Sequence, residues 1–329
     1  MDNLTPSLAV QERSEASLSN ISTSALDPVD EFLSGQLSDR TRRAYEADLR
    51  HFFQFTGVDA NLTLSILQNI THSHVISFRN HLAERDYKHT SINRKLSSLK
   101  AFFKMLLATG KIEKNPTDSA LVRGYKIEAN LTGKAIPKSA LNGIIAQIEV
   151  LEDPLMKARD MALFFVLMYG GLRRSEAAKM SWEHLIENDE HTLLLLPDTK
   201  SGTDQLIKMQ PVVLSKLFNY KKELELHDHP CLSSAPIFIS LARNNSHGKQ
   251  LTAQSVNLIV KRHARAAGVS QKITAHMFRH TCCTLAIEGG ARPQQVQSHL
   301  RHKDIKTTMK YYEDRNQITD NASDYIQSV

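Results

Sequence analysis

The spacing of apolar residues in the first third of the chain constrains its fold most. From Ser38, a residue type that caps helix N-termini, to Gly57, which ends the run, apolar side chains recur every three or four positions. Further segments before residue 111 repeat this period. Such segments pack their apolar faces together, so the sequence predicts a bundle of four to five helices over residues 29–115.

One stretch of the remaining chain interrupts the helical pattern. HTLLLLPDTKSGTDQLIKMQP, residues 191–211, has two extended runs on either side of the turn-forming cluster DTKSGTD, which predicts a β-hairpin. The segments before and after it, such as the strongly apolar MKARDMALFFVLMYGG, indicate helices through to the end of the chain. The predicted fold class is mainly α with a small β-sheet, an N-terminal helical domain being followed by a mixed α/β domain.

Composition sets the boundaries of these domains. Residues 1–28 are rich in Ser, Thr, Asn and acidic residues and poor in aromatic side chains, which is typical of disordered segments. Residues 116–135 are polar and contain two glycines, as linkers do. We therefore expect a disordered tail at 1–28, a helical domain at 29–115, a linker at 116–135 and a second domain at 136–329.

The charge of the chain fits a nucleic-acid partner. Its net charge is +6 and its pI about 9.1, a modest basic excess that lies outside the acidic residues 1–28. No apolar run approaches the roughly 20 residues that span a bilayer. The N-terminal residues also lack the layout of a signal peptide. We expect a cytoplasmic protein without a membrane partner.

Neither cysteines nor glycines point to a cofactor. Cys231, Cys282 and Cys283 show no CxxC spacing and are too few for a disulfide framework. We interpret Cys282 and Cys283 as small buried apolar residues. No glycine-rich phosphate loop of a standard type occurs, which disfavours a nucleotide-driven enzyme. The sequence predicts no metal and no cofactor.

The stretch TAHMFRHTCCT, residues 274–284, places His276, Arg279 and His280 within about one helical turn. Three interpretations are open: a metal site, a satisfied polar spot in the core, or a grip for an anion. An arginine beside the histidine argues against a bound cation, and a guanidinium binds an anion bidentately. The anion grip is favoured for His276 and Arg279, whereas His280 is interpreted as a packed residue bonded to the backbone.

Two other polar features have ordinary and functional interpretations side by side. In YGGLRRSEAAKM, Arg173 starts a helix and Glu176 lies one turn later on the same face. The two residues form either a surface ion pair, or a pair in which the guanidinium points at another group and the carboxylate supports its charge. Lys200, at the tip of the predicted hairpin, is either a solvated lysine or a point charge carried to a substrate.

Together, GLRRSE, TKSG, HMFRHT and HLRHKDIKTTMKYY make the chain resemble the tyrosine recombinases of the lambda-integrase family, which includes Cre-like and Xer-like site-specific recombinases. The resemblance runs from about residue 29 to 315. It implies a core-binding domain followed by a catalytic domain that cleaves and rejoins DNA through a 3′-phosphotyrosine. One departure is visible: Arg301 stands where the family commonly has a glycine before the histidine.

The resemblance also assigns the site. It implies catalytic roles for Arg173, Lys200, His276, Arg279, His302 and Tyr311, with Glu176 supporting the arginines. Tyr311 is chosen over Tyr312 because it stands nine residues after His302, as in the family.

In the helical domain, RTRRAYEADLRHFFQF and TSINRKLSSLKAFF resemble two core-binding helices. Arg42, Arg43, Arg94 and Lys95 are expected on their polar faces, either solvated or contacting phosphates. The implied partners are double-stranded DNA with specific recombination sites and three further copies, as a homo-tetramer on two synapsed sites. A type IB topoisomerase-like nicking-closing enzyme and a catalytically inert sequence-specific DNA-binding protein remain the alternatives.

Overall fold

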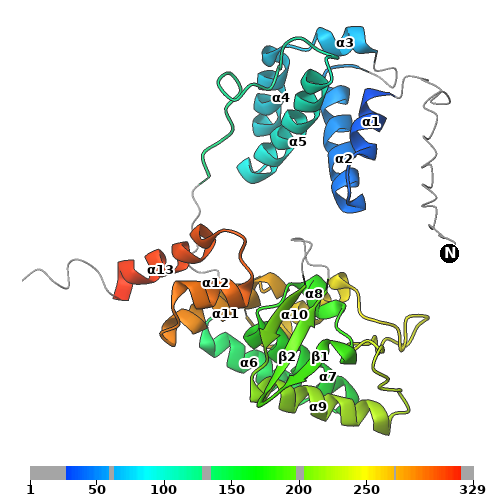
Figure 1. Ribbon diagram of the computed structural model, residues 1–329, viewed down its shortest axis with the longest axis vertical. Coiled ribbons are helices and arrows are strands. Elements are labelled where there is room, and N and C mark those ends of the chain that lie inside the picture. Colours follow the sequence, from blue (N-terminus) through cyan, green and yellow to red (C-terminus); the bar gives the residue numbers. More distant parts are fainter. Residues whose placement is uncertain (1–26, 59–62, 128–134, 198–203, 270–271, 320–329) are drawn as a thin grey trace, which may run out of the picture. The chain divides into compact units, whose positions relative to one another are not determined.

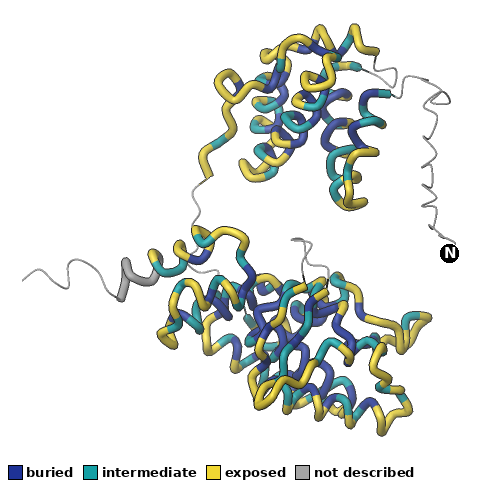
Figure 2. The backbone as a smooth tube through the Cα atoms, viewed as in Figure 1, coloured by how far each residue is buried: buried dark blue, intermediate teal, exposed yellow. Residues whose placement is uncertain are grey.

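The computed structural model describes residues 27–58, 63–127, 135–197, 204–269 and 272–319, with backbone alone at 314–319. Contacts divide the chain into two units, residues 1–129 and 130–329, each built mainly of helices (Figure 1). Buried backbone is concentrated in the interior of each unit (Figure 2). Among the described helices, none is long and apolar enough to cross a membrane.

The first unit is a helical bundle. Its helices are α1 (Pro28–Ser34), α2 (Asp39–Phe55), α3 (Leu64–Gln68), α4 (His72–Glu84) and α5 (His89–Ala108). The apolar stripes predicted from the period form one core, in which Phe52, Phe78 and Phe103 are fully buried. Ser38 stands at the N-cap of α2, and Gly57 follows this helix with a φ of +70°, a left-handed conformation that favours glycine.

The second unit surrounds one apolar helix. Its helices are α6 (Lys138–Glu149), α7 (Pro154–Gly170), α8 (Arg174–Ala178), α9 (Pro211–Leu226), α10 (Ala253–Ala266), α11 (Ala275–Glu288), α12 (Pro293–Leu300) and α13 (Ile305–Thr319), with the 3₁₀ turn η2 (Trp182–His184). Helix α7 packs against α6, α9 and α11, which explains why its sequence is apolar on nearly every side. Helices α11, α12 and α13 pack on one another at the end of the chain (Figure 1).

A three-stranded antiparallel sheet completes this unit. The strands β1 (Leu185–Asn188), β2 (His191–Leu196) and β3 (Gln205–Lys208) lie in the order β1-β2-β3. Strands β2 and β3 pair with Leu194 opposite Ile207, both buried, as the alternation of the predicted hairpin requires. The mainly helical class with a small sheet is therefore confirmed.

Three elements differ from the sequence expectation. The short helix α3 and strand β1 were not predicted, since five and four residues carry too little periodicity to be recognised. Between α9 and α10, the expectation of helix is wrong: residues 227–252 form turns with two isolated β-bridges, Ser181 to Pro236 and Ile239 to Gln250.

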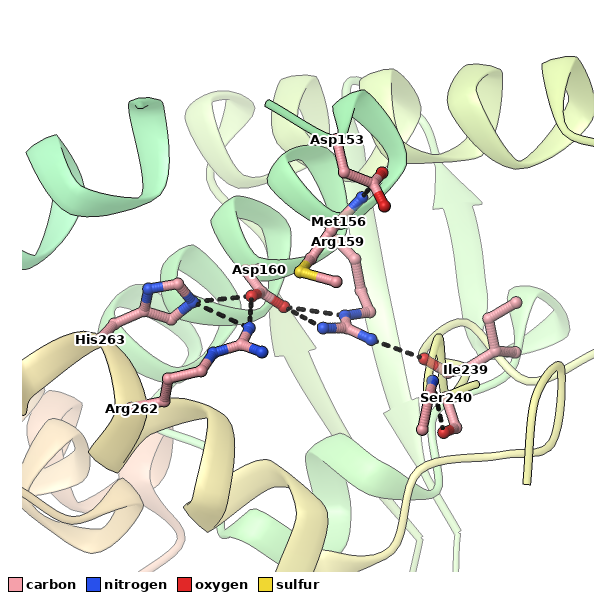
Figure 3. Close-up of polar contacts among 9 residues, drawn as sticks. Asp153, Met156, Arg159, Asp160, Ile239, Ser240, Arg262 and His263 are labelled. Atoms are coloured by element: carbon pink, nitrogen blue, oxygen red, sulfur yellow. Dashed lines mark hydrogen bonds and ion pairs between the residues drawn. The ribbon is translucent and has the colours of Figure 1, made fainter. Parts of the chain in front are cut away.

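A buried carboxylate ties α10 to α7 (Figure 3). Asp160 is fully buried; its Oδ2 lies 2.7 Å from His263 Nε2 and 2.6 Å from an Arg262 guanidinium nitrogen. Its Oδ1 accepts from Arg159 Nε at 2.8 Å. Burial alone would raise the pKa of Asp160, but the His263 hydrogen bond and the neighbouring arginines outweigh it and lower the pKa. This network fixes the helix that precedes Arg173 against the helix that leads into α11.

Candidate active site

Arg173 and Glu176 form the pair that the sequence suggested. Arg173 is the N-cap of α8, and its backbone N–H donates to Glu176 Oε2 at 2.7 Å. Its Nη1 lies 2.5 Å from Glu176 Oε1. The Arg173 side chain is 38% exposed, whereas Glu176 is 12% exposed. The mostly buried carboxylate therefore holds a guanidinium that stays more than a third exposed.

Arg279, on α11, is buried and anchored to the backbone. Its Nη1 donates to the carbonyl of Gly171 at 2.8 Å and its Nη2 donates to the carbonyl of Leu300. Gly171 has a φ of +56°, and a Cβ there would lie 3.2 Å from the sulfur of Cys282 and closer still to the Leu300 side chain. The backbone conformation and the close approach of the Cys282 and Leu300 side chains thus favour glycine at this position.

His276 and His280 lie on the same face of α11, one turn apart. Their ring centroids are 4.7 Å apart with an interplanar angle of 81°. His280 Nδ1 hydrogen-bonds the hydroxyl of Tyr311 on α13, a partner that the sequence did not predict. The hydroxyl of the next residue, Tyr312, donates instead to the carbonyl of Ala291. Tyr311 is therefore bonded to one member of the histidine pair.

His302 lies in the turn between α12 and α13. Its Nδ1 is 2.9 Å from Thr308 Oγ1, and Thr308 is fully buried. Burial, followed by the charges of Arg279, Arg173, Arg301 and His276, lowers the pKa of His302 to about 4. The imidazole is therefore neutral near pH 7.

Two of these charges, those of Arg301 and Arg173, also act on Arg279. Burial, then the positive charges of Arg301 and Arg173, lowers the pKa of Arg279 to about 10. Both residues thus belong to one cluster of positive charge formed by side chains at the start of α8, on α11 and in the α12–α13 turn. Such a cluster of positive charge favours binding of an anion over a cation, in agreement with the anion grip predicted from the sequence.

The adjacent cysteines belong to the packing beneath this site. Cys282 and Cys283 are buried in a cluster with Ile287, Val296 and Leu300. Burial raises the pKa of both thiols to about 12, so they are protonated near neutral pH. The interpretation of both as small buried residues is confirmed.

Two family models match the chain. One, the phage integrase family, matches residues 136–317, more than half of the chain, and the other, the phage integrase N-terminal SAM-like domain, matches residues 30–110. The chain belongs to the phage integrase family. The resemblance to tyrosine recombinases, inferred from four short motifs, is thereby confirmed.

Individual relatives agree with this membership. The chain is 27% identical over 294 residues to the tyrosine recombinase XerD of Listeria innocua, covering 87% of this chain and 93% of the relative. It is 28% identical over 282 residues to the tyrosine recombinase XerC of Rickettsia typhi, covering 83% and 86%.

Two solved structures share the fold. One is the XerH site-specific recombinase bound to a palindromic difH substrate, with a TM-score of 0.66 at 18% identity, covering 86% of this chain and 79% of that chain. The other is a lambda integrase dimer bound to a COC′ core site, with a TM-score of 0.65 at 18% identity, covering 89% and 95%. Both likenesses concern the architecture, which matches the one predicted.

Most of the predicted catalytic residues come together in the second unit. Arg173 stands at the start of α8, His276 and Arg279 lie on α11, His302 lies in the α12–α13 turn, and Tyr311 lies on α13. Helices α11, α12 and α13 pack on one another. The charges of Arg173, Arg279 and His276 act on His302. Lys200 lies in sequence between β2 and β3, outside the described residues.

The residues predicted to contact DNA have unequal surroundings. Arg42 and Arg43 are exposed on α2. Arg94, on α5, is 52% exposed, although its Nη2 donates to the buried carboxylate of Asp48 at 2.7 Å. The expected solvated position of Lys95 is wrong: its side chain is 10% exposed, and its Nζ lies 3.1 Å from Asp48 Oδ1. Because this ammonium neutralises a buried carboxylate, we no longer assign Lys95 a phosphate contact.

Sequence reasoning missed two members of the site. The interpretation of His280 as a packed residue bonded to the backbone separates it from His276, but its Nδ1 hydrogen-bonds Tyr311, and the spacing of four residues places both histidines on one helix face. Arg301 was noted only as a departure from glycine, yet its Nη2 lies 2.7 Å from Glu176 Oε2. No local signal predicts this contact, because 125 residues separate the two positions.

Proposed function

We propose that the chain is a site-specific recombinase that cleaves and rejoins DNA strands through a 3′-phosphotyrosine on Tyr311. The observation that carries the proposal is the convergence of Arg279, Arg173 and neutral His302 beside the tyrosine-bearing helix. The relatives named tyrosine recombinase and the neighbours solved on recombination sites support this reading.

In the proposed first step, the hydroxyl oxygen of Tyr311 attacks a backbone phosphorus. A tyrosine–phosphorus bond forms while the bond to the 5′-oxygen breaks, which leaves a 3′-phosphotyrosine and a free 5′-hydroxyl. One phosphate diester replaces another of similar energy, so no nucleotide is consumed. Attack by a 5′-hydroxyl from a partner strand reverses the step and joins new ends.

Each side chain has a distinct role in this step. Arg173 and Arg279 stabilise the charge that gathers on the non-bridging oxygens, a task for preorganised donors. The pair His276–His280 accepts the proton of Tyr311, and neutral His302 donates a hydrogen bond to the phosphate. Lys200 protonates the leaving 5′-oxygen.

The proposed partner is double-stranded DNA with a specific site, bound by both units. XerH and lambda integrase are described in complex with such sites, and we extend this property to the chain. Arg42, Arg43 and Arg94 are the proposed phosphate contacts of the first unit. We further propose a homo-tetramer on two synapsed sites, because exchange between two duplexes needs four cleaved strands.

The test is capture of the covalent intermediate without metal or ATP. Genomic fragments bound by the protein are selected, rebuilt as nicked suicide substrates, and incubated with the wild type, Tyr311→Phe and Tyr312→Phe before a detergent quench. We expect a protein–DNA adduct that only Tyr311→Phe abolishes. An adduct retained in Tyr311→Phe overturns the assignment of the nucleophile.

The remaining outcomes separate the alternatives. A wild type that binds the fragments but forms no adduct is an inert DNA-binding protein. A wild type that forms the adduct and relaxes a supercoiled plasmid, yet never joins strands from two sites, is a nicking-closing enzyme. Recombinant junctions between two sites establish the recombinase.

A further inference from the structure

Arg301 occupies a backbone conformation that favours glycine. It is the C-cap of α12, with φ +56° and ψ +48°, in the left-handed region. A residue with a Cβ is less stable there than glycine by about 1–2 kcal/mol. The arginine therefore carries a backbone cost that its side chain must offset.

The side chain is buried and directed at the site. It is 3% exposed; its Nη1 donates to the carbonyl of His299 at 2.9 Å and its Nη2 to Glu176 Oε2 at 2.7 Å. Its Nε is also buried and has no hydrogen-bond partner among the residues that the structure describes. A purely structural cap would need neither the charge nor this desolvation, which is costly for a guanidinium.

Through Glu176, Arg301 is linked to Arg173. The two oxygens of the carboxylate divide between the two guanidiniums: Oε1 faces Arg173 Nη1 at 2.5 Å, and Oε2 accepts from Arg301 Nη2. Burial alone would raise the pKa of Glu176, but the charge of Arg301 and the hydrogen bonds of Arg173 outweigh it and lower the pKa. The carboxylate therefore stays ionised and fixed.

We infer that Arg301 is a positioning residue for DNA cleavage: it clamps Glu176, which in turn fixes Arg173 at the scissile phosphate. This inference rests on the proposed recombinase function. It assigns to the α12 C-cap a role in addition to the turn geometry that glycine would supply.

Arg301→Gly is the decisive variant because glycine adopts the same backbone conformation without strain. Single-turnover adduct formation on the suicide substrate is measured together with DNA affinity and the melting temperature. We expect cleavage to slow by about 10- to 100-fold, the range found for residues that orient the ligands of a site. DNA affinity should stay at the wild-type value, and Arg301→Lys should recover part of the rate. Arg292→Ala, which removes one positive charge at the other end of α12, is the control and should cleave normally.

The route through Glu176 has its own test. Glu176→Gln should also slow cleavage, and adding Arg301→Gly to it should slow the reaction no further, since both remove the same link. Additive losses in the double variant overturn the clamp.

The results distinguish this inference from the proposed function. If the wild type forms the adduct and a folded Arg301→Gly forms it equally fast, the inference fails while the recombinase stands. If Arg301→Gly does not fold, Arg301→Asn decides, because asparagine tolerates the left-handed conformation but is too short to reach Glu176, and cleavage at the wild-type rate then overturns the inference. If the wild type forms no adduct on bound DNA, the proposed function fails and the inference with it.

Discussion

The imidazole of His280 hydrogen-bonds the hydroxyl of Tyr311, and this contact joins α11, which carries Arg279, to α13. The proposed nucleophile is thus held by a residue one position after the buried arginine. Tyr312 points to a different partner, the carbonyl of Ala291. The two adjacent tyrosines therefore make separable contacts.

We predict that His280→Ala slows adduct formation by about 10- to 100-fold, because a nucleophile without its partner samples the reactive geometry less often. DNA affinity should not change. Tyr312→Phe is the matched control: it loses the bond to Ala291, about 1 kcal/mol of stability, and should cleave at the wild-type rate. Equal rates for His280→Ala and the wild type on a suicide substrate would show that the contact has no part in cleavage.

The lowered pKa of His302 predicts that the stability of the folded protein depends on pH. Burial and the charges of Arg279, Arg173, Arg301 and His276 lower its pKa to about 4, from the ordinary histidine value of 6.5. As pH falls from about 6.5 to 4, the unfolded chain binds a proton here before the folded chain does, so the free energy of unfolding decreases. Above pH 6.5 this effect is absent.

The measurement compares melting temperatures of the wild type and His302→Gln at pH 7.5 and pH 5. The wild type should lose more stability on acidification than the variant, which has no titrating group at this position. His299, whose pKa burial also lowers, is present in both proteins and cancels in the comparison. Equal losses in the two proteins would contradict the neutral state of His302.

A third prediction concerns the buried network in Figure 3. Asp160→Asn removes the negative charge that Arg159, Arg262 and His263 surround, and leaves Arg159 buried without its counter-charge. We expect a loss of about 3–5 kcal/mol in the free energy of unfolding, the usual result of breaking a buried ion pair.

Urea unfolding provides this measurement, with Glu288→Gln as the control. Glu288 pairs with Lys138 at 3.0 Å, but the two side chains are 44% and 72% exposed. Its loss should therefore cost less than about 1 kcal/mol. Similar values for the two variants would mean that the Asp160 network does not hold α10 on α7.

The sequence predicted those parts of the molecule that local pattern determines. The period of 3.6 residues predicted α2, α4 and α5, and alternation around a turn cluster predicted β2 and β3. Arg173 and Glu176 were paired correctly because three residues separate them on one helical turn.

What the sequence could not predict depends on contacts between distant segments. Arg301 meets Glu176 only because the tertiary fold brings together two side chains that lie 125 residues apart in the sequence. Lys95 looked solvated, yet it neighbours Leu96 in the apolar stripe, and its ammonium finds Asp48 on another helix. Whether a charged side chain next to an apolar stripe is buried or exposed depends on its partner. That partner lies on another helix, so the local sequence does not reveal it.

The last prediction separates DNA contact from stability on the first unit. Arg43 is exposed, so Arg43→Ala should weaken DNA binding, reduce the salt slope of log Kd by about one and leave the melting temperature unchanged. Lys95→Met should leave DNA binding and its salt slope unchanged but lower the melting temperature. It removes the ammonium beside buried Asp48 and costs up to about 3 kcal/mol, since Arg94 and Ser98 still bond the carboxylate.

Fluorescence anisotropy of labelled DNA over a range of salt concentrations gives the slopes, and thermal unfolding gives the stabilities. Because each variant removes one positive charge, the two have the same net charge, and a difference between them does not come from net charge. A reduced slope in Lys95→Met at a temperature where it is folded would restore Lys95 to the phosphate contacts. An unchanged slope in Arg43→Ala would remove Arg43 from them, because counterion release accompanies every neutralised phosphate.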